Sequence, residues 1–111
     1  MAVKFGERIK ELRVARGLTL EQLAQATDSA KSYIWELENK NPPRPSAEKL
    51  SAIAEALGVT VDYLFGRDDQ TLAEAEDKAF YRAYSSMPES TRRQIREMAK
   101  ILGTKTPETK S

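Results

Sequence analysis

The sequence predicts an all-α fold, and three observations support this prediction. Apolar side chains recur three or four residues apart along most of the chain, the spacing that places them on one face of an α-helix. Glycine, proline and hydroxyl-bearing residues stand between these stretches, at positions typical of helix starts and stops. The clearest stretch covers residues 18–39, LTLEQLAQATDSAKSYIWELEN, which indicates two short helices joined by a tight turn.

An amphipathic first helix is predicted over residues 3–16. Phe5, Ile9 and Leu12 repeat at i, i+4 and i+7, so they share one face of this helix. Gly17 follows directly, and glycine is the residue type that most often ends a helix.

Thr19 is predicted to cap the first helix of the central pair. Gln22 stands three residues further on, the spacing at which its side chain returns to the backbone N–H of the cap. Residues 27–29, TDS, then interrupt the apolar pattern with side chains that can bond the nearby backbone. The second helix is therefore expected to start at about Ala30.

The second helix of the pair has an apolar face and a polar face. Ile34 and Leu37 are predicted to be buried. At about 100° per residue, Ser32, Glu36 and Asn39 then fall within about 40° of the opposite direction. This outward face is small and polar, so the helix has little bulk to keep it from entering a groove.

A stiff loop is predicted after this helix, because residues 40–46, KNPPRPS, contain three prolines that restrict the backbone and prevent helix continuation. Ser46 is expected to cap a fourth helix that ends at Gly58. Residues 60–65 then form a predicted short fifth helix before Gly66.

The chain beyond Gly66 contains two further apolar stripes, which predict a helical hairpin. Pro88 stands where its second helix begins and Gly103 where it ends. Residues 104–111 show no periodicity, so we expect them to be disordered. The predicted organisation is a five-helix domain over residues 1–66, a C-terminal helical hairpin over 67–103 and a disordered tail over 104–111.

The composition excludes several classes of site. The chain has no Cys and no His, which rules out disulfides, thiolate or imidazole metal sites and catalysis by either side chain. Asp68 and Asp69 are adjacent carboxylates, but no glycine loop or metal-ligand spacing surrounds them. We therefore expect no catalytic residues, no metal, no cofactor and no enzymatic activity.

Net charge and hydropathy limit the partners and the location. Residues 1–66 carry nine basic and nine acidic side chains, so any contact with nucleic acid must come from local placement. No apolar run approaches the roughly 18 residues of a membrane span. Residues 1–6 do not form a signal peptide, and we expect a cytoplasmic protein.

Four motifs at matching spacing resemble the DNA-binding domain of the Cro and phage-repressor family, the XRE-type regulators. They are IKELRVARGLT, LAQAT, KSYIWELEN and LSAIAEALGVTVDYLFG, and the resemblance covers roughly residues 5–66. It implies a lambda-repressor-like fold that binds double-stranded DNA. The sequence departs from the family at Asp28 and Lys40, where glycine is common, although Asp tolerates a positive φ better than most residues.

The resemblance also implies a structural ion pair between Arg13 and Glu38. This pair would tie the first helix to the third. Arginine suits the role because its planar guanidinium can bind a carboxylate through two hydrogen bonds. Neither residue would then contact DNA.

The residues that read bases are predicted to be Lys31, Ser32 and Glu36. Lysine can donate to guanine O6 and N7, a serine hydroxyl can meet several base edges, and glutamate can accept from cytosine N4. Arg44, held by the proline-rich loop, is predicted to meet a phosphate or the edge of the minor groove, and the alternative is a solvated side chain.

Two aromatic side chains flank this face. We expect Tyr33 and Trp35 to be half-buried against neighbouring helices, and the alternative is contact with a sugar or a thymine methyl group. The complete predicted DNA-binding set is Gln22, Ser29, Lys31, Ser32, Tyr33, Trp35, Glu36, Asn39, Lys40 and Arg44.

The expected function is sequence-specific transcriptional regulation, by a repressor that binds an inverted-repeat operator as a homodimer. The small polar face of the third helix favours DNA, because a helix that docks on protein more often presents Leu, Phe or Met. The alternative is an antitoxin-like or antirepressor-controlled protein that acts through a protein partner of the C-terminal helices. The predicted dimerisation residues are Phe80, Tyr84, Met87, Ile95, Met98 and Leu102.

Overall fold

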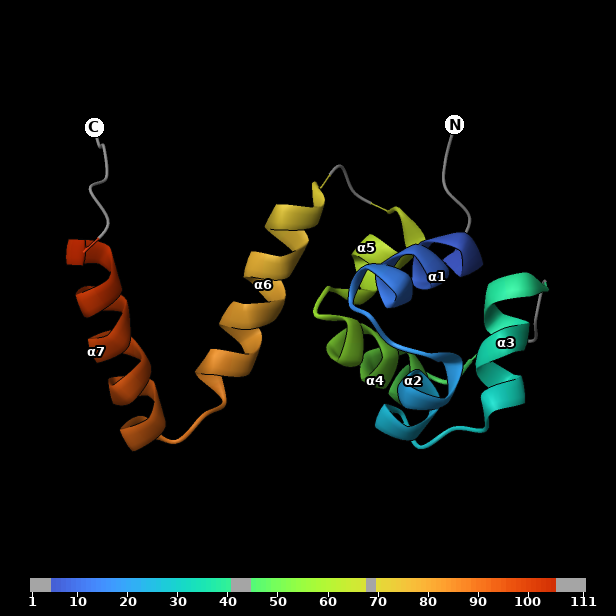
Figure 1. Cartoon of the computed structure of the whole chain (residues 1–111), viewed down its shortest axis with the longest axis horizontal. Helices are drawn as coiled ribbons and strands as arrows, with labels where there is room; N and C mark the ends of the chain where they lie inside the picture. Colours follow the sequence, from blue (N-terminus) through green and yellow to red (C-terminus); the bar gives the residue numbers. More distant parts are fainter. Residues whose placement is uncertain (1–4, 41–44, 68–69, 106–111) are drawn as a thin grey trace. The chain divides into compact units, whose positions relative to one another are not determined.

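The computed structural model describes residues 5–40, 45–67 and 70–105, with side chains up to residue 103. Within these residues the regular structure is entirely helical, which confirms the predicted all-α class (Figure 1). The chain divides into two compact units, and the boundary along the sequence lies between Phe80 and Tyr81. The helices are α1 (Phe5–Ala15), α2 (Leu20–Ala26), α3 (Lys31–Asn39), α4 (Ala47–Leu57), α5 (Val61–Phe65), α6 (Leu72–Ser85) and α7 (Glu89–Lys105).

The core of the first unit lies between α1, α2, α3, α4 and α5. Each of these helices contributes at least one large side chain with no more than 1% of its surface exposed. Burying such a side chain contributes roughly 1.5–3 kcal/mol. Helix α3 packs against α1 and α2 and stands at one edge of this bundle (Figure 1). The fully buried large residues are Ile9, Leu23, Ile34, Leu37, Ile53, Leu57 and Leu64.

The caps predicted from the sequence are present. The Thr19 hydroxyl accepts a hydrogen bond from the Gln22 N–H at 3.0 Å, and the Thr19 N–H donates to Gln22 Oε1 at 2.9 Å. This reciprocal pair is a capping box at the start of α2. Ser46 caps α4 by accepting from the Lys49 N–H at 3.1 Å. Local sequence therefore fixes where α2 and α4 begin.

The two departures from the family pattern take different conformations. Asp28 adopts a φ of +54°, so an aspartate occupies the left-handed region at the position where glycine is common. Lys40 instead has extended backbone with φ −125° and donates its N–H to the Glu36 carbonyl at 2.9 Å. Only the Asp28 position therefore has the backbone conformation that favours glycine.

The first unit extends beyond residue 66, where the sequence places the end of the DNA-binding domain. Ala75 of α6 is fully buried in the core of the first unit. Arg16 donates from Nη2 to the Glu76 carboxylate at 2.8 Å and from Nε to the Leu57 carbonyl at 2.9 Å. The first half of α6 therefore packs with α1–α5 in the first unit.

Helix α7 is longer than predicted. Gly103 lies inside the helix, which continues to Lys105, so Gly103 does not end it. A single glycine costs a helix only about 1 kcal/mol relative to alanine, and the helix passes through it. Residues 104 and 105 of the predicted disordered tail are thus helical, and residues 106–111 lie outside the described residues.

The start of α7 is held by charged hydrogen bonds. Glu89 accepts from Arg92 Nη2 at 2.8 Å and from Arg96 Nη2 at 3.0 Å, and Arg96 Nη1 donates to the Tyr84 hydroxyl at 2.7 Å. The hydrogen bond from Arg96, with its charge, lowers the pKa of the Glu89 carboxyl below its usual value.

Across the described part of the chain, no helix has the length and apolar character needed to cross a membrane.

Candidate nucleic-acid interface

Helix α3 separates its two faces as the helical wheel predicts. Ile34 and Leu37 are at most 1% exposed. Ser32, Glu36 and Asn39 are all exposed to solvent. The Asn39 side chain is partly committed, because its Nδ2 donates to the Trp35 carbonyl at 2.9 Å. Ser32 and Glu36 therefore stand on the outward face of α3.

A polar groove lies where α2 and α3 begin. Lys31 is exposed in this groove, and its Nζ lies 4.0 Å from a Glu21 carboxylate oxygen. Gln22 also lines it, and its side-chain oxygen is used by the capping box, so its NH2 group remains the donor. The groove is lined by Thr19, Glu21, Gln22, Ala24, Gln25, Ser29 and Lys31.

Ser29 is part of the turn itself. Its hydroxyl accepts from the Thr27 hydroxyl at 3.0 Å and donates to the Thr27 carbonyl at 3.2 Å. Thr27 is only 3% exposed, and its single hydroxyl hydrogen is shared between the Ser29 hydroxyl and the Leu23 carbonyl, which lies 2.9 Å away. Ser29 is therefore bonded within the turn as well as lining the groove.

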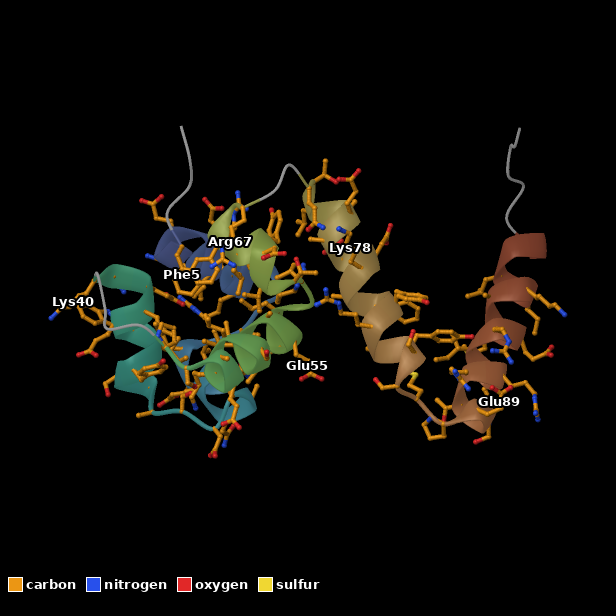
Figure 2. All side chains as sticks on the ribbon, turned by 180° about the vertical axis from the view of Figure 1, so that it is seen from behind. Phe5, Lys40, Glu55, Arg67, Lys78 and Glu89 are labelled. Carbon is orange, nitrogen blue, oxygen red and sulfur yellow. The ribbon has the colours of Figure 1, made fainter. Side chains whose placement is uncertain are left out.

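The two aromatic residues of α3 differ in exposure. Tyr33 is partly buried against the core, and this burial raises the pKa of its hydroxyl. Trp35 is 44% exposed, which is close to the half-buried state expected from the sequence. The Lys40 Nζ lies 5.6 Å from the centre of the Trp35 ring, and Figure 2 shows Lys40 pointing outward from the end of α3. Trp35 and Lys40 therefore belong to the outer surface of α3.

Arg13 and Glu38 meet in a two-bond ion pair. Arg13 donates from Nε to Oε2 of Glu38 at 2.6 Å and from Nη2 to Oε1 at 3.0 Å. Its Nη1 donates to the Leu18 carbonyl at 2.9 Å, so Arg13 also holds the segment before α2. The Arg13 side chain is 11% exposed and that of Glu38 is 1% exposed. This pair fixes α3 against α1 from the inner side, away from the outward face.

Lys49 of α4 makes a contact that the sequence analysis did not predict. Its Nζ donates to the Thr27 carbonyl and to the Asp28 carbonyl, both at 2.9 Å. It also lies 5.9 Å from the centre of the Tyr33 ring. No sequence signal identifies this contact, because the lysine and the turn are 21 and 22 residues apart and meet only through tertiary packing.

The family follows from comparison with known proteins. A helix-turn-helix family model matches residues 9–64, just over half of the chain. The chain belongs to the helix-turn-helix family. The matched region contains α2, the turn at Asp28, α3 and α4, with most of α1 and α5. The resemblance to the XRE-type regulators is thereby confirmed.

Three relatives illustrate what this helix-turn-helix chain is similar to. YobD of Bacillus subtilis, an uncharacterized HTH-type transcriptional regulator, is 39% identical over 67% of this chain and 65% of its own length. The immunity repressor of Bacillus phage phi105 is 36% identical over 68% of this chain and 50% of its own length. SinR of Bacillus licheniformis, an HTH-type transcriptional regulator, is 35% identical over 60% of each chain. The chain thus spans 50–65% of the length of these curated relatives.

Two solved structures of SinR match different extents of the chain. SinR in complex with DNA, described as the master regulator for biofilm formation, matches with a TM-score of 0.51 and 35% identity, over 54% of this chain and 95% of that chain. A chain of the SinR–SinI protein complex matches with a TM-score of 0.54 and 28% identity, over 90% of this chain and 98% of that chain. The second match therefore extends beyond the helix-turn-helix region.

The predicted dimerisation residues are divided between the two units. Phe80 ends the first unit, and the other five belong to the second. Met98 and Leu102 are each 60% exposed, whereas Tyr84, Met87 and Ile95 are partly buried. Ile101, three residues after Met98, is also exposed, at 56%.

Two further predictions concern Arg44 and metal binding. Arg44 lies outside the described residues. Among the described residues, no three Asp, Glu, His or Cys side chains come together in a way that could hold a metal ion.

Proposed function

We propose that this chain is a DNA-binding transcriptional regulator, acting as a repressor, whose α3 enters the major groove. The observation that carries the proposal is the outward face of α3, where Ser32 and Glu36 are exposed opposite the buried Ile34 and Leu37. A helix of this kind can place short polar side chains against base edges. The relation of the chain to SinR, which has been crystallised with DNA, supports the proposal.

The first experiment is selection of a binding site from a pool of randomised DNA duplexes. Trp35 is the only tryptophan of the chain and lies on the outer surface of α3, so its fluorescence reports binding without a label. Residues 1–66 have no net charge, and we expect tight binding only to a selected sequence. Equal binding to all duplexes, or none, would contradict the proposal.

Glu36→Ala is expected to relax base preference at one position of the selected duplex. A glutamate carboxylate accepts a hydrogen bond from cytosine N4, so its removal should reduce discrimination at that base pair by about 1–3 kcal/mol. Titration against a panel of single-base variants of the duplex measures this loss.

Arg44→Ala is the comparison for Glu36→Ala. A phosphate contact carries no base information, so this change should weaken all duplexes of the panel to a similar extent. If Glu36→Ala also lowered affinity uniformly across the panel, Glu36 would not read a base.

We also propose that the second unit joins two copies of the chain. One α3 covers one half-site, and an inverted repeat needs two of them about 34 Å apart. Ile95, Met98 and Leu102 follow one another at helical spacing on α7, and Met98 and Leu102 are each 60% exposed. The same stripe on a second copy would cover it in a two-fold symmetric interface.

Met98→Glu is expected to convert a dimer into a monomer and to weaken binding to an inverted-repeat duplex by about a hundredfold or more. The side chain is 60% exposed in the single chain, so the new charge disturbs the interface and not the fold of α7. Ile95→Glu should have the same effect. Sedimentation of the intact protein, followed by titration with the duplex, measures both changes.

Lys100→Gln is the matched control, because it changes the charge by the same one unit at an exposed position about 200° around α7 from Met98. Truncation is a further test, and the cut belongs after Phe80 because Ala75 is part of the first core. We expect the shortened chain to be a folded monomer. If it remained a dimer, the interface would lie in the first unit.

A second candidate function is capture of a different protein by the C-terminal helices. It is favoured by the match to a chain of the SinR–SinI complex, which covers 90% of this chain. Sedimentation distinguishes the two possibilities. An intact protein that is monomeric, and that Met98→Glu leaves unchanged, would favour this second function over homodimerisation.

A further inference from the structure

Asp28, in the turn between α2 and α3, has a backbone conformation that its residue type does not favour. Asp28 has a φ of +54°, and left-handed backbone costs residues other than glycine roughly 1–2 kcal/mol, with Asp among the more tolerant. The capping box fixes only the start of α2, and Ala30, the N-cap residue of α3, makes no side-chain cap hydrogen bond. The hydroxyls of Thr27 and Ser29 bond within the turn, but neither bonds the Asp28 carbonyl, so a donor from outside the turn can stabilise this conformation further.

Lys49 supplies such a donor from α4. Its ammonium donates to the carbonyls of Thr27 and Asp28, both at 2.9 Å, so it binds the residues on both sides of the peptide that enters the left-handed position. These oxygens follow the C-terminus of α2, where a positive charge is favourable. The Lys49 backbone is itself held in the first turn of α4 by the hydrogen bond to Ser46.

We propose that Lys49 is a positioning residue for DNA binding, which holds the Asp28 turn in the conformation that presents α3. This inference rests on the proposed function. Lys49 offsets the strain of a non-glycine residue in the turn, and its Nζ also lies 5.9 Å from the Tyr33 ring on α3. Without Lys49, a part of the population adopts other turn conformations, and the apparent affinity for DNA falls by the fraction that remains competent.

The proposal predicts that Asp28→Gly compensates for loss of Lys49. Glycine adopts a positive φ without strain, so the turn no longer depends on the lysine. We expect Lys49→Met to weaken binding to the selected duplex about tenfold in the intact protein. In a protein that already carries Asp28→Gly, the same change should weaken binding by less than about twofold. The probe is the duplex that the intact protein selects from the randomised pool.

A salt titration separates positioning from direct contact with DNA. If the Lys49 ammonium bound a phosphate, Lys49→Met would lower the salt slope of binding by about one unit, and Asp28→Gly would not restore affinity. That result would overturn the proposal. We expect the salt slope to stay unchanged within the Asp28→Gly background. Lys10→Met, which removes an exposed lysine of α1, is the control for the loss of one charge.

A second measurement does not depend on DNA. Lys49→Met should lower the urea midpoint more in the Asp28 protein than in the Asp28→Gly protein, because only the former needs the lysine to hold its turn. Equal shifts in the two backgrounds would overturn the proposed role of Lys49. If the intact protein selected no duplex, the proposed function would fail, and this comparison would still decide whether Lys49 stabilises the turn.

Discussion

Arg13→Ala is expected to destabilise the protein by about 3–5 kcal/mol, because it leaves a buried carboxylate without its partner. The Glu38 side chain is only 1% exposed, and both of its oxygens accept hydrogen bonds from Arg13. Water cannot replace these bonds without opening the contact between α1 and α3. Urea unfolding of the single variants Arg13→Ala and Glu38→Ala measures the loss.

The double variant distinguishes a buried pair from two independent residues. Arg13→Met combined with Glu38→Leu removes both charges together, so it should cost much less than either single change to alanine. The pair of Lys31 and Glu21 is the control, since these side chains are 60% and 74% exposed and 4.0 Å apart. Their coupling should stay below about 1 kcal/mol. Small, additive effects at Arg13 and Glu38 would mean that the ion pair does not form in solution.

Helix starts could be predicted from the sequence because their signals are local. Thr19 and Gln22 cap α2 through atoms three residues apart, and Ser46 caps α4 in the same way. The Arg13–Glu38 pair was available only through the family resemblance, because nothing within either helix relates residues 25 positions apart. The sequence therefore determines local boundaries, while the pairing of helices needs information from relatives.

The features that were missed depend on tertiary contacts. In the sequence, Lys49 is an ordinary lysine in the first turn of a helix. Its two carbonyl partners, Thr27 and Asp28, lie in the turn after α2. Ala75 reads as one small member of the second stripe, and only its complete burial joins α6 to the first unit. In each case a distant segment decides the environment of the residue.

Gly6 shows the same limit, and it gives the second large expected effect. Helix propensity alone favours alanine over glycine in the first turn of α1 by roughly 0.5–1 kcal/mol. In the structure, a Cβ on this residue would collide with the Leu37 carbonyl oxygen and lie 2.8 Å from that of Glu38. Both obstacles are backbone atoms of α3, which cannot turn aside as a side chain would.

Gly6→Ala is therefore expected to destabilise the protein by about 1–3 kcal/mol, opposite in sign to the effect of helix propensity. To relieve the collision, α1 and the C-terminal end of α3 must move apart, and this movement also lengthens the hydrogen bonds between Arg13 and Glu38. The urea midpoint measures the loss of stability. Weaker binding to the selected duplex should accompany it, because α3 is displaced.

Two controls separate the collision from helix propensity. Lys10→Ala changes an exposed residue of α1 and should be nearly neutral. Gly103→Ala replaces a glycine of α7 that has no atom within 4 Å of the added Cβ, so propensity alone acts there and helix content should rise. If Gly6→Ala stabilised the protein as Gly103→Ala stabilises α7, the close approach of α1 to the end of α3 would be absent in solution.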